Sequence, residues 1–100
     1  MEATKLSEPE IAAVLAKLPS WSLQNGKLHR EYKFKNFLSA FSFMSSTAFI
    51  IHELVHHPEW FNLDTLVRVD LNTHDVGGIS SLDAKLAYAM EEMAARQLGR

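Results

Sequence analysis

The sequence predicts an α+β fold, a two-layer sandwich in which helices cover one face of a mostly antiparallel sheet. Three observations lead to this prediction. Apolar residues recur at helical spacing in three segments, two other segments alternate between apolar and polar residues, and the elements follow the order α-β-β-α-β-α. No repeat or linker interrupts the 100 residues, so we expect a single domain over residues 1–100.

The first helix is predicted to begin after Ser7, which can cap it. Glu10 lies three residues further on and completes a capping box, and Pro9 is tolerated in the first turn. Pro19 ends the helix. Its apolar face is formed by Ile11, Val14, Leu15 and Leu18.

A β-hairpin is predicted in the segment "WSLQNGKLHREYKF". Asn25-Gly26 is favoured in a type I′ turn, in which both central residues have positive φ. Residues 27–35 then alternate, which suits a strand with one buried face. The first arm, "PSWSL", is the shorter strand of the pair.

Asn36 is predicted to cap a long second helix, "FLSAFSFMSSTAFIIHELV", which ends before Pro58. We expect this helix to be central to the core. Its predicted buried stripe consists of Phe37, Phe41, Met44 and Ala48, widened by Leu38, Phe49 and Ile50.

A single strand is predicted over "NLDTLVRVDLNT", with Leu63, Thr65, Val67, Val69 and Leu71 on one face. A loop with Gly77 and Gly78 follows. Ser80 or Ser81 then begins the last helix, whose buried side is formed by Leu82, Leu86, Met90 and Met93.

Composition excludes several kinds of protein. The net charge is −2 and the basic residues are scattered, so no large basic patch for nucleic acid or anionic membrane is expected. Cysteine is absent, which removes disulfides, thiolate catalysis and sulfur-ligated zinc. No signal-peptide core is present and the apolar run "TAFII" is too short to span a bilayer, so we expect a cytoplasmic protein. An exposed sheet edge could pair with a second copy.

Histidine is concentrated in two places. The chain has five histidines, of which three lie in "HELVHH" and His74 lies in "NTHDVGG". His52 and His56 are four residues apart, which predicts one face of the second helix, whereas His57 points elsewhere. Three interpretations are open: ordinary surface or core histidines, a metal site using the i, i+4 pair, or acid–base catalysis without metal.

Acid–base catalysis fits the residue type, because the ordinary pKa of histidine allows proton transfer near neutral pH. A helix C-terminus favours the imidazolium and a second nearby imidazolium disfavours it, so one ring can be protonated while its neighbour is neutral. The aromatic residues Trp60 and Phe61 follow directly; they could stack on a planar ligand or pack in the core.

From about Leu18 to Ala94 the sequence resembles the pterin-4a-carbinolamine dehydratases. The resemblance rests on "LPSW", "YKFKNFLSAFSFM", "HHPEWFN" and "VDLNTHDVGGIS", and on a signature formed by His52, His56, His57, Pro58, Trp60, His74 and Asp83. It implies a four-stranded antiparallel sheet, and assembly as a homodimer or homotetramer. Since three strands are predicted above, the fourth would be the segment "HPEWFN", split from the strand that follows it, or a short strand not yet recognised.

The resemblance also implies the reaction, loss of water from a 4a-hydroxytetrahydropterin to give quinonoid dihydropterin during pterin recycling for aromatic amino acid hydroxylation. The leaving hydroxyl gains a proton and the ring nitrogen N5 loses one, so no metal or other cofactor is required. By position, His56, His57 and His74 are the expected catalytic set. The expected substrate contacts are His57, Pro58, Trp60, Thr73 and Asp75.

His52, Glu53 and Asp83 are expected to support the site. Some relatives have an acidic residue at the position of His52. In this chain His52 could orient His56, bind substrate or face solvent. The resemblance also implies a rival function, a module that binds a protein partner as a dimerisation cofactor or assembly chaperone. The segment "FLSAFSFMSS" would then contact the partner, although it also suits an ordinary core and homodimer surface.

Overall fold

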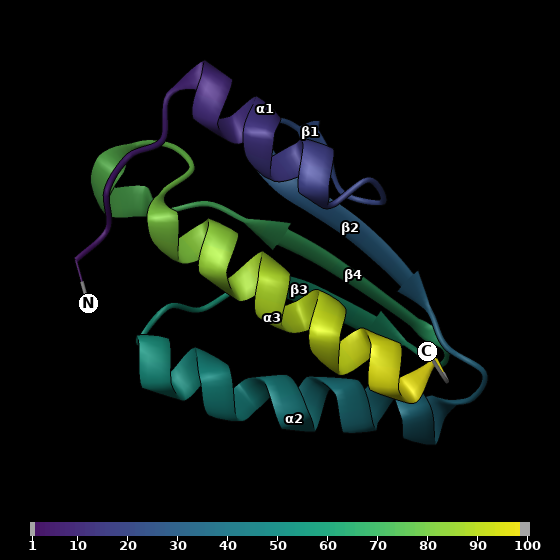
Figure 1. The fold of residues 1–100 in the computed structure, drawn as a ribbon. Coiled ribbons are helices and arrows are strands. Elements are labelled where there is room, and N and C mark those ends of the chain that lie inside the picture. The colour runs from purple at the N-terminus through teal and green to yellow at the C-terminus, as the bar shows by residue number, and fades with distance from the viewer. Residues whose placement is uncertain (1, 99–100) are drawn as a thin grey trace.

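In the computed structural model, which describes residues 2–98, the helices cover one face of a four-stranded antiparallel sheet (Figure 1). The strand order in the sheet is β1-β2-β4-β3. The elements are α1 (Glu8–Lys17), β1 (Ser22–Gln24), β2 (Lys27–Lys33), α2 (Phe37–Leu54), β3 (Glu59–Leu63), β4 (Leu66–Leu71), the 3₁₀ turn η1 (His74–Val76) and α3 (Ser81–Gln97).

The predictions for the first third of the chain are confirmed. Ser7 and Glu10 form the capping box at the start of α1, with each side chain accepting a backbone N–H from the other residue. Asn25 and Gly26 have φ values of 53° and 74°, as a type I′ turn requires, and they join β1 to β2.

The single strand predicted over residues 62–73 is wrong, because the chain reverses direction inside it, and the fourth strand is the one that the segment "HPEWFN" was expected to offer. Asp64 has a φ of 51°, a conformation that aspartate tolerates better than most residues. The Asn62 amide donates hydrogen bonds to the backbone oxygens of Asp64 and Leu66, at 3.1 Å and 2.9 Å. The result is a hairpin of β3 and β4, which supplies the fourth strand and gives the order α-β-β-α-β-β-α.

The predicted buried stripe of α2 is wrong for five of its seven residues, and Met44 and Ile50 are the two that pack against the core, partly buried. The buried residues are Ser39, Ala40, Phe43, Thr47 and Ile51. Four of the predicted stripe's large side chains are instead more than half exposed: Phe37 51%, Leu38 72%, Phe41 52% and Phe49 79%. Because α2 carries apolar residues on more than one side, helical spacing alone could not decide which side faces the sheet.

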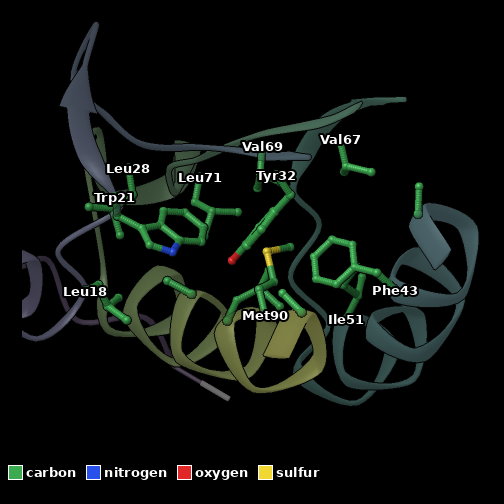
Figure 2. Close-up of a cluster of buried hydrophobic side chains, with 14 of the residues drawn as sticks. Leu18, Trp21, Leu28, Tyr32, Phe43, Ile51, Val67, Val69, Leu71 and Met90 are labelled. Carbon is green, nitrogen blue, oxygen red and sulfur yellow. The ribbon is translucent and has the colours of Figure 1, made fainter. Parts of the chain in front are cut away.

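The core lies between the sheet and the two long helices (Figure 2). The Tyr32 ring from β2 meets Phe43 of α2, with ring centroids 4.9 Å apart, and Trp21, with centroids 6.4 Å apart. Burial, reinforced by the hydrogen bond from the phenol to the Glu91 carboxylate, raises the pKa of Tyr32. The segment after α2 is joined to the first turn of α3 by a hydrogen bond between His56 and Asp83.

Length and composition alone would allow α2 to cross a membrane, since it has 18 residues with a mean hydropathy of 1.3. A core helix of a globular protein passes the same test, and α2 buries one side against the rest of the fold. The helix is therefore weak evidence for a membrane protein.

Candidate active site

The end of α2 determines where two of the histidines lie. Val55, directly after the helix, has a left-handed backbone with a φ of 52°. The N–H groups of Val55 and His56 donate to the last carbonyls of α2, at 3.2 Å and 3.3 Å. The helix thus ends at Leu54, not at Pro58. His56 lies beyond the helix, so the predicted helical pair of His52 and His56 is wrong.

His56 is buried and bonded to a carboxylate on another element. Its ring nitrogen Nε2 donates to Oδ1 of Asp83, in the first turn of α3, over 2.5 Å. His56 is 8% exposed and Asp83 is fully buried. In the neutral ring this bond assigns the proton to Nε2 and leaves Nδ1 free to accept a proton.

The second oxygen of Asp83 accepts two further hydrogen bonds. The Thr73 hydroxyl and the Ser80 backbone N–H lie 2.8 Å from Oδ2. Ser80 is the N-cap of α3, and Asp83 and Ser80 form a capping box. A buried carboxylate without such partners would be strongly unfavourable, so the cap of α3 also stabilises the charge beside His56.

His74 and Asp75 project from the 3₁₀ turn that follows β4, and both are exposed. The turn is closed at its base by backbone hydrogen bonds in both directions between Thr73 and Gly78, at 2.7 Å and 3.3 Å. Because Thr73 also contacts Asp83, the backbone leading to His74 lies beside the pair formed by His56 and Asp83.

His57 faces a different part of the same region, a cavity of about 310 Å³. This volume is at the lower end of the range for small-molecule sites. An adjoining hollow of about 460 Å³ runs along α2, and Ala48 and His52 line both. The first cavity is lined by Ala48, Ile51, His52, His57, Pro58 and Trp60.

The spacing of His52 and His56 no longer supports a metal site. The ligand pair was expected on one helical face, and Val55 turns the chain out of the helix between the two histidines. Within residues 2–98 no three histidine or acidic side chains are placed to hold a metal ion.

The structure brings seven of the expected site residues into two neighbouring groups, while His74 and Asp75 lie on the exposed turn outside both. His56, Thr73 and Asp83 share one buried hydrogen-bond network, and His52, His57, Pro58 and Trp60 line one cavity. Glu53 is exposed on α2. Sequence reasoning missed Ser80 as part of the network, although its spacing of three from Asp83 is a capping-box signal.

The fifth histidine, His29, lies in β2 and pairs with Asp70 of β4 in the sheet register. Its Nδ1 is 2.8 Å from an Asp70 carboxylate oxygen and its Nε2 is 2.9 Å from one of Glu31. Burial lowers the pKa of His29, but the hydrogen bonds to Asp70 and Glu31 outweigh it and raise the pKa above the ordinary 6.5.

The sequence also matches a known protein family. The sequence profile described as "Pterin 4 alpha carbinolamine dehydratase" matches residues 4–93. The chain belongs to the pterin-4a-carbinolamine dehydratase family. The expected resemblance is thereby confirmed. The match begins closer to the N-terminus than the resemblance did, at residue 4 in place of about Leu18.

Members of the pterin-4a-carbinolamine dehydratase family from several bacteria are similar over almost their whole length. A protein of Solibacter usitatus, provisionally named pterin-4-alpha-carbinolamine dehydratase, is 49% identical over 92 residues, covering 92% of this chain and 97% of that protein. One of Rhizobium etli with the same provisional name is 46% identical over 100 residues, covering 98% and 99%.

A solved structure has the same fold. The crystal structure of a "transcriptional coactivator/pterin dehydratase" from Brucella melitensis superposes with a TM-score of 0.87 at 40% identity. The match covers 91% of this chain and 99% of that one.

Proposed function

We propose that this chain is a 4a-hydroxytetrahydropterin dehydratase, a hydro-lyase that forms quinonoid dihydropterin and supports pterin recycling in the cytoplasm. The observation that carries the proposal is the buried pair of His56 and Asp83, which leaves one imidazole nitrogen free beside the turn bearing His74. The family and its relatives support the same reaction class.

The reaction needs two proton transfers at adjacent atoms. The hydroxyl on carbon 4a gains a proton and leaves as water, and N5 loses a proton while the bond between C4a and N5 becomes double. Electrons and atoms balance without a redox partner, so imidazole groups are sufficient catalysts. We assign the acid and base roles to His56 and His74, and assign His57 to holding the substrate with a share in proton transfer.

The remaining residues would hold the ring. Trp60 and Pro58 line the cavity with His57, where a flat heterocycle could stack on the indole. His52 lines the same cavity, which favours a contact with substrate over a purely solvent-facing role. Asp75 lies on the exposed turn with His74, and we assign it to the polar edge of the pterin; Glu53, which is exposed on α2, is assigned a supporting role.

The direct test is a stopped-flow assay that follows disappearance of a 4a-hydroxytetrahydropterin. We expect turnover by the purified chain at an unchanged rate when a chelator is added. His56→Ala, His57→Ala and His74→Ala should each remain folded and lose turnover. Full activity in one variant removes that residue from the assignment, and loss of activity with chelator would restore the metal interpretation.

A protein-binding function is the second candidate, and the exposed apolar side of α2 favours it. Phe37, Leu38, Phe41 and Phe49 lie exposed there, and residues 37–51 contain no charged side chain. An uncharged apolar surface of this kind is typical of contact surfaces. We propose a homodimer or homotetramer through this side, and a protein partner as the alternative, since the Brucella structure is described as a coactivator.

Light scattering of the wild type and of Phe49→Glu tests the surface. We expect the wild type to be oligomeric and the variant to dissociate while it keeps its helical circular dichroism. A monomeric wild type that captures a stoichiometric protein partner, without pterin turnover, would favour the binding module over the enzyme.

A further inference from the structure

Thr73 carries a feature that the proposed chemistry does not use, a buried side-chain hydroxyl between Ser80 and Asp83. The residue is 6% exposed. Its Oγ1 lies 2.8 Å from Asp83 Oδ2 and 2.6 Å from Ser80 Oγ. Its backbone N–H and C=O are also engaged, because both bond within the turn that carries His74. The side chain of Thr73 is therefore engaged inside the protein, and the contact with substrate expected of this residue is not assigned to its hydroxyl.

The directions of these hydrogen bonds follow from counting protons. An ionised carboxylate only accepts, so Thr73 donates its single hydroxyl proton to Asp83. Thr73 Oγ1 must then accept from the Ser80 hydroxyl. Ser80 Oγ in turn accepts from the backbone N–H of Leu82, at 3.2 Å. The chain of donors runs in one direction, from the first turn of α3 through Ser80 and Thr73 to Asp83.

Asp83 consequently connects two imidazoles that arise from separate elements. Its Oδ1 accepts from His56, which follows α2, while its Oδ2 accepts from Thr73, the residue immediately before His74. Without the Thr73 hydroxyl, Oδ2 would retain only the Ser80 N–H, and the Ser80 hydroxyl would lose its acceptor. The carboxylate would then be held by two hydrogen bonds in place of three, and the backbone leading to His74 would lose its side-chain link to the carboxylate.

We propose that Thr73 is a positioning residue that sets the placement of His56 and His74 relative to each other through Asp83. This inference rests on the proposed function insofar as those two histidines exchange protons with the pterin. Its structural part, the dependence of both rings on one buried hydroxyl, stands independently of the reaction.

The experiment compares Thr73→Val with Thr73→Ser and with Thr47→Val. Valine has nearly the shape of threonine and lacks the hydroxyl, while serine keeps it. Thr47 is a matched control, because it is fully buried on α2 and its hydroxyl has no hydrogen-bond partner in the described part of the chain. Thr73→Ala serves as a second, smaller variant if valine does not fold.

We expect kcat of Thr73→Val to fall by about 10- to 100-fold, the range known for residues that orient metal-bound histidines, with KM little changed. Thr73→Ser should retain most of the wild-type kcat, and Thr47→Val all of it. A Thr73→Val or Thr73→Ala enzyme with wild-type kcat would overturn the proposal. So would an equal loss in Thr73→Ser, since the hydroxyl would then not be responsible.

A second readout separates this inference from the proposed reaction. In the wild type, the buried Nε2 proton of His56 should give a slowly exchanging imidazole resonance in the NMR spectrum. We expect Thr73→Val to broaden or remove that resonance and to shift the ring signals of His74, even if the chain turns over no pterin. Unchanged signals from both rings would overturn the proposal, whether or not the wild type is a dehydratase.

Discussion

Within residues 2–98, two buried histidines bond to carboxylates, and they differ in how many of their ring nitrogens do so. His56 bonds to Asp83 through one ring nitrogen, whereas His29 bonds to Asp70 and Glu31 through both. The first arrangement leaves a nitrogen available for chemistry. The second occupies both nitrogens, and because a neutral imidazole donates from only one, it favours the imidazolium.

The comparison indicates what distinguishes a candidate catalytic histidine from a structural one in this fold. Burial and a nearby carboxylate are common to both. The differences are the free ring nitrogen and the neighbours, since His56 lies beside the turn of His74 and His29 lies within a β-strand.

The largest expected effect separates the two histidines by activity. His56→Ala should lower dehydratase turnover by about 10²- to 10⁴-fold, the usual contribution of a positioned acid or base. His29→Ala should keep turnover near the wild-type value, because its ring nitrogens are both occupied by carboxylates. Stopped-flow assays of both variants provide the measurement. A similar loss in His29→Ala would break the distinction.

Removal of the Asp83 carboxylate should destabilise the protein more than removal of the Asp70 carboxylate. Asp83→Ala leaves the buried His56, Thr73 and Ser80 groups without their acceptor and should lower the free energy of unfolding by about 3–5 kcal/mol. Asp70→Ala should cost about 1 kcal/mol, because Asp70 is partly exposed and Glu31 remains bonded to His29. Urea unfolding monitored by tryptophan fluorescence measures both. Equal losses in the free energy of unfolding would show that the buried network of Asp83 stabilises the protein no more than the partly exposed bond of Asp70.

The pKa of His29 makes its bond to the carboxylates depend on pH. Since the folded pKa is raised above 6.5, the stabilisation is complete below about pH 6.5 and is lost as the pH rises through the folded pKa. The charged groups that face His29 across the open side of the sheet are Lys27, Glu31, Glu59, Arg68 and Asp70.

The measurement is the difference in free energy of unfolding between wild type and His29→Gln. This difference should be larger at pH 6 than at pH 9. A difference that is constant over this range, or that grows with pH, would contradict the raised pKa.

The smallest effect is expected for the surface pair of Lys27 and Glu59, whose atoms lie 2.7 Å apart on the same side of the sheet as His29. Lys27→Ala should change the free energy of unfolding within experimental error, because exposed pairs contribute little in water. A clear loss would show that the charges around His29 act as one network.

The predictability of the fold differed along the chain for physical reasons. Local signals predicted the caps at Ser7 and Asn36 and the turn at Asn25-Gly26, since each depends on a few neighbouring residues. The position of the turn at Asp64 was not predicted, because the alternation of apolar residues continues through it. The buried side of α2 depends on what packs against it, which helical spacing cannot decide.

The candidate site, like the fold, could be predicted only where local sequence signals decide the structure. The motif brought His56, His57, His74 and Asp83 together as a set, but their arrangement depends on Val55, whose left-handed backbone has no glycine signal in the sequence. The network of Thr73 and Ser80 requires β4 and α3 to meet in space. Its residues could be found from sequence, and its connections could not.

One titration tests the central claim most directly. The wild-type chain is titrated with a reduced pterin product analogue while the imidazole NMR signals of all five histidines are recorded. The rings of His56, His57 and His74 should shift together and saturate at one pterin concentration, while His29 stays unchanged. Saturable binding of the pterin without a change in the chemical shifts of His56 and His74 would contradict the account.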